Sequence, residues 1–156
     1  MNRQIRETLT ASEGRYLTPG EAKIVRSFAQ RLDKSLTAVE DLEAKEDAIV
    51  DLALREAVKQ SAELATRWQA GNLMVRRDLQ LLLRYIAQAA VRGDLEFLPT
   101  QLFSWLEPVL LGAGLVGAPA KILFTALEQA ALAELSPAAS EVLRPYLAQL
   151  GVALSS

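Results

Sequence analysis

The strongest restriction on the fold comes from apolar residues that recur at spacings of three and four. One stripe consists of Val25, Phe28, Leu32, Leu36, Val39 and Leu42, and a second of Leu79, Leu82, Leu83, Ile86, Ala87 and Ala90. Such spacing places side chains on one face of an α-helix, whereas a half-buried strand requires alternation. No segment of the sequence has a strand pattern, so we predict an all-α fold.

Breaks between the stripes divide the chain into seven or eight predicted helices. Thr18–Pro19–Gly20–Glu21 is a strong helix start, with a Thr N-cap, a Pro in the first turn and a Glu three residues after the cap. The charged segment Glu40–Asp47 predicts a joint between two helices, with its carboxylates on a solvated face. Gly71–Asn72 and Gly93 mark further breaks. The other predicted helices cover about residues 2–13, 49–60 with a short continuation to 68, 98–109 with interruptions at Pro108 and Gly112, 118–134 and 137–153.

Composition excludes several kinds of chemistry. The 156-residue chain contains no Cys and no His, so it lacks thiols, the commonest general base and the usual proximal ligand of a haem. No phosphate loop, paired metal ligands or nucleophile–base set appears. The net charge of −2, with Lys and Arg interleaved with Asp and Glu, argues against nucleic-acid binding. We therefore expect a binder or scaffold rather than an enzyme, with no metal site.

The sequence shows neither a secretion signal nor a membrane span. The N-terminal segment MNRQIRETLT has no apolar core. The most apolar stretch, residues 109–118, is about half as long as a membrane span and carries three glycines. We therefore expect a cytoplasmic protein. Its length suits one domain, and no internal repeat or linker divides it.

Two segments resemble the phycobiliproteins, especially allophycocyanin. The first is EGRYLTPGE at residues 13–21, which is similar to the turn before the long helix of that family. The second is VRRDLQLLLR at residues 75–84, which is similar to the family's chromophore helix. The resemblance implies a single globin-like domain over residues 1–156, with an N-terminal helical extension and turn over 1–18 and a globin body over 19–156.

At the chromophore helix the chain departs from the family in ways that affect pigment binding. Val75 occupies the position of the cysteine that links the bilin, so the resemblance implies no covalently bound bilin. Leu81 and Leu82 replace two tyrosines. Arg77 and Asp78 are retained; in the family this Arg pairs with a propionate and this Asp with pyrrole nitrogens, which implies a non-covalent bilin contact through both residues. The alternative is that Arg77 and Asp78 are ordinary exposed helix residues.

The resemblance also implies association with a protein partner. In the family the N-terminal helices pack against a second globin-like subunit, because their apolar face would otherwise be exposed. The corresponding surface of this chain consists of Ile5, Leu9, Tyr16, Leu17, Val25 and Phe28. The family's partner-binding Arg is retained as Arg84, but Ala11 replaces the acid that would meet it, so that cross-subunit salt bridge cannot form. We expect a dimer; the alternative is that the first helix folds onto its own domain.

Within this superfamily the chain resembles the globins associated with bilin biosynthesis. That resemblance implies a non-enzymatic accessory protein, a homodimer or one bound to a bilin-biosynthesis enzyme, which assists haem oxygenase or bilin reductase by contact or by handing over bilin. Two alternatives stay open. One is a non-pigmented structural subunit of the phycobilisome. The other is a haem-free sensor globin that binds an apolar ligand, such as a fatty acid, beside the helix over residues 79–90.

Overall fold

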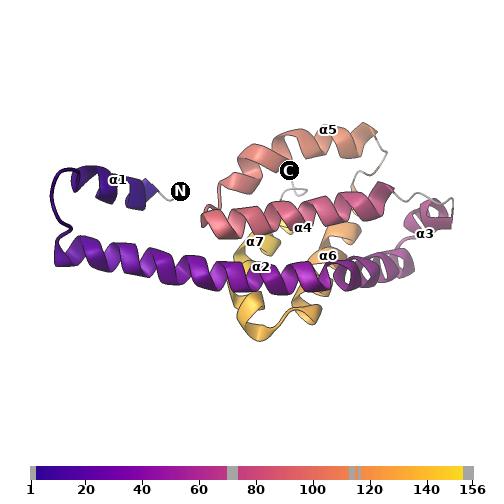
Figure 1. The fold of residues 1–156 in the computed structure, drawn as a ribbon. Helices are drawn as coiled ribbons and strands as arrows, with labels where there is room; N and C mark the ends of the chain where they lie inside the picture. Colours follow the sequence, from indigo (N-terminus) through magenta and orange to yellow (C-terminus); the bar gives the residue numbers. More distant parts are fainter. Residues whose placement is uncertain (1–2, 70–73, 113–114, 116, 153–156) are drawn as a thin grey trace.

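Helices account for nearly all of the chain that the structure describes. This computed structural model describes residues 3–69, 74–112, 115 and 117–152. Its helices are α1 (Arg3–Ala11), α2 (Pro19–Gln60), α3 (Ala62–Gln69), α4 (Met74–Arg92), the π-helical turn η1 (Pro99–Phe103), α5 (Ser104–Gly112), α6 (Ala118–Glu134) and α7 (Pro137–Val152) (Figure 1). No β-strand occurs in these residues, which confirms the predicted all-α class. The predicted break at Gly71–Asn72 lies outside them.

The long helix α2 begins where the sequence predicts. The Thr18 side-chain oxygen accepts a hydrogen bond from the Glu21 N–H at 3.3 Å, and the Glu21 carboxylate accepts one from the Thr18 N–H at 2.7 Å. Arg15 donates to both oxygens of the same carboxylate, at 2.7 and 2.9 Å. The first turn of a helix has backbone donors without intrahelical partners, and this arrangement satisfies the N–H groups of Thr18 and Glu21 while it ties the preceding turn to α2.

The predicted joint at Glu40–Asp47 is wrong, because α2 runs unbroken through it for 42 residues. Glu, Ala and Lys are good helix formers, and Asp41 pairs with Lys45 one turn later at 2.8 Å. The carboxylates are not a free solvated face either. Asp41 accepts a hydrogen bond from the Ser136 N–H at 2.8 Å, and two later acids pair with α4. The partners are distant in sequence, so local charge density does not reveal them.

The predicted interruption at Pro108 is also wrong, because α5 continues through that residue to Gly112. Proline lacks the N–H that would bond to the carbonyl four residues earlier. That carbonyl belongs to Ser104, the first residue of α5, which directly follows η1. The missing bond therefore falls at the junction of η1 and α5. The predicted interruption at Gly112 stays a prediction, because residues 113–114 lie outside the described part of the chain.

Helix α2 is the spine of the body, and α4, α6 and α7 all pack against it. Figure 1 shows α4 running beside α2, with α5 over α4. The predicted apolar stripe of α4 lies in the core, where Leu79, Leu83 and Ile86 are almost completely buried. Each such side chain contributes roughly 1.5–3 kcal/mol through burial. Burial of this stripe therefore determines which residues of α4 face the core and which face away from it.

Helix α4 ends at Gly93, as predicted. The backbone there has φ 62°, a left-handed conformation that glycine adopts at little cost. The Gly93 N–H donates to the Ala90 carbonyl at 3.1 Å, and the Asp94 N–H donates to the Ala89 carbonyl at 3.2 Å. These two bonds satisfy carbonyls that the helix end would otherwise leave free. A Cβ at position 93 would lie only 1.9 Å from Nη1 of Arg31, so α2 also approaches closely here.

The N-terminal part of the chain projects from this body. In Figure 1 the first half of α2 extends past the other helices, and α1 folds back along it. We refer to residues 3–36 as the arm. Ile5 is only 5% exposed, because one face of α1 packs against α2. The arm is therefore a helical hairpin held together by an internal apolar contact.

Candidate functional site

A mostly apolar cleft lies between α4, the η1–α5 segment and α6. Its volume is about 270 Å³, close to the lower limit of roughly 300 Å³ for small-molecule sites in proteins. It is lined by Val75, Arg77, Asp78, Leu79, Leu81, Leu82, Leu102, Leu106, Val109, Leu110, Leu115, Leu123 and Phe124. Two of these residues, Arg77 and Asp78, are charged. We call this space the α4–α5 cleft.

Helical spacing on α4 explains how the cleft is built. Val75, Leu79 and Leu82 follow one another at intervals of four and three, which places them on one face of the helix. Leu79 and Leu82 are buried, whereas Leu81 on α4 and Val109 on α5 are exposed. The cleft therefore has a buried apolar floor and exposed apolar residues at its opening. A ligand with a flat apolar body would remove this surface from water.

Arg77 and Asp78 lie in the lining, where the sequence predicts tetrapyrrole contacts. Arg77 Nη2 is 3.4 Å from Asp78 Oδ1, and the two side chains are 65% and 47% exposed. Exposed ion pairs of this kind contribute at most about 1 kcal/mol. Neither group is locked in place, so both can turn toward a ligand. The structure brings Arg77 and Asp78 together at the cleft; their contact with a tetrapyrrole stays a prediction.

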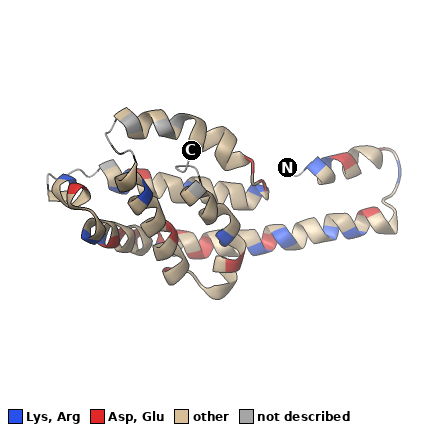
Figure 2. Cartoon of the chain, turned by 180° about the vertical axis from the view of Figure 1, so that it is seen from behind, with Lys and Arg blue, Asp and Glu red and all other residues tan. Residues whose placement is uncertain are grey.

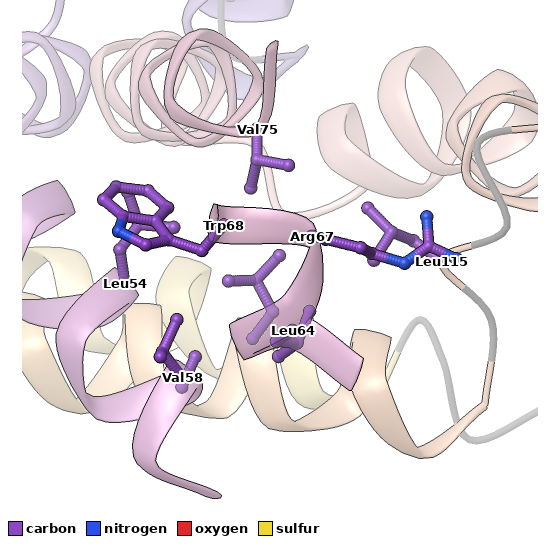
Figure 3. Close-up of a pocket in the computed structure, with 9 residues that line it drawn as sticks. Leu54, Val58, Leu64, Arg67, Trp68, Val75 and Leu115 are labelled. Atoms are coloured by element: carbon purple, nitrogen blue, oxygen red, sulfur yellow. The ribbon is translucent and has the colours of Figure 1, made fainter. Parts of the chain in front are cut away.

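Val75 separates the cleft from a second, much smaller space. It lines both the cleft and a void of about 20 Å³, which has room for about one water molecule. Figure 3 shows the side chains of Val75, Leu64 and Trp68 gathered around this void, with Leu54 and Val58 of α2 below. Helix α3 therefore fills the space behind Val75. The valine offers no thiol and the chain contains no cysteine, so a bilin in the cleft cannot be held through a thioether bond.

Ion pairs between α2 and α4 fix the position of the cleft-lining helix. Arg84 pairs with both carboxylate oxygens of Glu46, at 2.9 and 3.0 Å. Arg76 pairs with Asp47 at 3.0 Å and also with Asp51. The α4 residues lie eight apart and so share one face of the helix. Sequence reasoning missed this role of the acids, because their partners lie on a helix far along the sequence and no local pattern joins the two sets.

The predicted interface residues divide into two groups. Ile5 is buried between α1 and α2, whereas Tyr16 is 98% exposed and Leu9 and Leu17 are also exposed. Val25 and Phe28 are half-buried, and the Phe28 ring lies 5.1 Å from the guanidinium of Arg31. Arg84 is engaged with Glu46 of its own chain. The exposed part of the predicted surface is thus the α1–α2 turn and one side of the arm.

The described residues offer neither a metal site nor a membrane-spanning helix. No group of three or more Asp and Glu residues there could hold a metal ion. Among the same residues, no helix is both long enough and apolar enough to span a bilayer. The candidate ligand site is the α4–α5 cleft. Sequence reasoning missed its contributions from α5 and α6, since periodicity shows that a face is apolar and not which helix it meets.

Comparison with known proteins gives one result that covers most of the chain. A family model described as phycobilisome protein matches residues 10–154. The match contains all residues that line the cleft and begins within α1. No curated protein sequence matches the chain.

Proposed function

The chain belongs to the phycobilisome protein family, and from that premise we propose that it is a non-enzymatic accessory protein that holds an open-chain tetrapyrrole without a covalent bond. The observation that carries this proposal is the α4–α5 cleft, which combines an apolar lining with one cation and one anion. Val75 at the cleft supplies no thiol. Release of the ligand therefore requires no bond to break, which suits a protein that passes a bilin on.

The chemistry of a bilin matches the charged residues of the cleft. Its pyrrole N–H groups are donors, which the Asp78 carboxylate can accept, and its propionates are anions, which the Arg77 guanidinium can pair with. Such charge-assisted hydrogen bonds are stronger than neutral ones. A tetrapyrrole is larger than the enclosed volume, so part of it would lie over Leu81 and Val109 at the opening.

A spectral titration tests ligand binding. Biliverdin or phycocyanobilin added to the purified protein is expected to gain a sharper, red-shifted absorption band as the pigment becomes rigid. Asp78→Ala and Arg77→Ala should each weaken binding by roughly tenfold, the effect of losing one hydrogen bond to a charged group. Glu134→Ala, at an exposed acid on α6 away from the cleft, is the matched control. An unchanged spectrum at high protein concentration would exclude the proposed ligand.

The accessory role is tested separately. We propose that the protein assists haem oxygenase or a bilin reductase, by direct contact or by accepting the bilin product. Co-expression with these two enzymes should raise pigment yield, and the Asp78→Ala variant should raise it less. An unchanged yield together with no complex in pull-down with either enzyme would argue against this role and leave the titration result intact.

A second candidate is a structural phycobilisome subunit without pigment. The exposed turn and arm favour it, because Tyr16, Leu9 and Leu17 offer apolar surface to another protein. The engagement of Arg84 by Glu46 argues against pairing through that arginine. Co-sedimentation with assembled phycobilisomes would support this candidate; exclusive recovery of the protein in the unbound fraction would oppose it.

A further inference from the structure

A groove of about 400 Å³ lies between α1 and α2 in the arm. Its polar lining consists of Gln4, Lys23, Ser27 and Arg31. Each of these four side chains can donate a hydrogen bond. Its apolar lining consists of Ile5, Ile24 and Phe28. We call this space the arm groove. No acid occurs among the described residues that line it, so its lining offers cations and donors without a carboxylate to oppose them.

Helical spacing on α2 separates the polar lining of the arm groove from the apolar lining. Lys23, Ser27 and Arg31 follow one another at intervals of four, so they form one row along the helix. Ile24 and Phe28 are also four apart and form the neighbouring row. Both apolar side chains are half-buried. A ligand that joins a charged head to an apolar body would match the two rows at once.

The Arg31 guanidinium has no counter-ion among the described residues. It is half-buried, lies 5.1 Å from the centre of the Phe28 ring, and forms no ion pair in that part of the chain. Its Nη2 atom is buried and has no hydrogen-bond partner there. A buried donor without a partner is destabilising. A water molecule would satisfy the hydrogen bond but leave the charge unpaired, whereas an anion supplies both contacts.

Two acids of the arm are already paired with other cations. Glu7 of α1 pairs with Arg3, and Glu21 of α2 pairs with Arg15, each at 2.7 Å. Lys23 forms no ion pair with any residue that the structure describes. The arm carries seven Lys and Arg against four Asp and Glu, a net charge of +3, and Figure 2 shows mostly blue bands on the projecting half of α2. The field around the groove therefore attracts an anion from outside the chain.

We propose that the arm groove binds an organic anion, with a carboxylate or phosphate head at Arg31 and Lys23 and an apolar body over Ile24 and Phe28. An oxygen of the head would accept a hydrogen bond from Arg31 Nη2, the donor that lacks a partner, and Lys23 would add a second positive charge. The volume of the groove lies within the range of roughly 300–1,000 Å³ for small-molecule sites. The groove shares no residue with the α4–α5 cleft, so the proposal does not depend on bilin binding.

Four kinds of probe test the need for both a head and a body. Octanoate and octyl phosphate carry both, octanol lacks the charge, and acetate and inorganic phosphate lack the apolar body. NMR titration of the full chain should show the amide signals of Ile24, Ser27 and Phe28 shifting to saturation with octanoate, octyl phosphate or both. Octanol, acetate and inorganic phosphate should each bind at least about tenfold more weakly. The proposal would be overturned if neither amphiphile shifted these signals, or if octanol bound as tightly as the amphiphiles.

Variants that each remove one positive charge test the head contacts. Lys23→Gln and Arg31→Gln should each raise the dissociation constant of the tighter amphiphile by at least about fivefold, because each removes a charge-assisted contact. Arg26→Gln is the matched control: Arg26 lies between them on α2, is exposed and does not line the groove, so the constant should stay within about twofold. An equal loss with Arg26→Gln would show attraction to the net charge of the arm alone and would overturn the site.

Two further measurements keep the result specific to the arm groove. Lys23 is exposed, so circular dichroism of Lys23→Gln should match the unaltered chain even if Arg31→Gln loosens the arm. Arg77→Ala changes only the α4–α5 cleft and should leave the dissociation constant measured at Ser27 and Ile24 unchanged. A loss of binding at these signals with Arg77→Ala would place the probe in the cleft and overturn the proposal.

Discussion

At the scale of single residues, Val75 determines what kind of bond the cleft can form. It lies in the wall shared by the cleft and the small void beneath α3, and its side chain is half-buried. A thiol at this position would face a bilin held by Arg77 and Asp78. Thiols add to the exocyclic double bond of a bilin with formation of a thioether, and no other atom need leave. The cleft is therefore one substitution away from the means of covalent attachment.

We accordingly predict that Val75→Cys allows covalent attachment of phycocyanobilin. The modified protein should gain the mass of one pigment and keep its colour in denaturing gels. Val58→Cys is the matched control, because Val58 lines the void behind Val75 and does not line the cleft. Labelling of Val58→Cys to the same extent would show that thiol reactivity alone, rather than the geometry of the cleft, governs attachment.

At the scale of helices, the start of α2 and the end of α4 both depend on local backbone chemistry. We predict that Gly93→Ala costs about 1–2 kcal/mol in the free energy of unfolding, because a side chain is strained at φ 62°. The Arg31 guanidinium would also have to move away from the new Cβ. Urea unfolding measures the loss. Gly20→Ala, at a helical position with open space around it, should instead gain about 0.5–1 kcal/mol, and equal losses at both sites would contradict this account.

The start of α2 gives a pH-dependent prediction. Hydrogen bonds from Arg15, first, and from Thr18 lower the pKa of Glu21 from 4.5 to about 2. A carboxyl whose pKa is lower in the folded state stabilises the fold fully above its unfolded pKa and loses that contribution as pH falls. The contribution of Glu21 should therefore be complete above about pH 4.5 and fade toward pH 2. Glu21→Gln should remove this part of the pH dependence, as measured by the difference between the two stability curves.

Local pattern predicted the helices better than their joints. Thr18 and Gly93 were predictable because a cap and a left-handed glycine act within one turn. The prediction of a joint at Glu40–Asp47 was wrong because this segment also makes stabilising contacts with α4 and with Ser136, which lie far along the sequence. The prediction at Pro108 was wrong for a similar reason. The position of this proline relative to η1 decides how much the missing hydrogen bond destabilises the helix. Helix ends set by local bonds were thus accessible from sequence, and those decided by neighbours were not.

At the scale of the whole molecule, the cleft is assembled from α4, the η1–α5 segment, Leu115 and α6, whose mutual placement no local pattern contains. Arg77, Asp78 and Val75 were identified from the α4 segment alone, through resemblance. Leu106 and Phe124, from α5 and α6, complete the lining and look in sequence like any other core positions. The same applies to the arm, where Ile5 is buried and Leu9 exposed although both are apolar residues of one short helix.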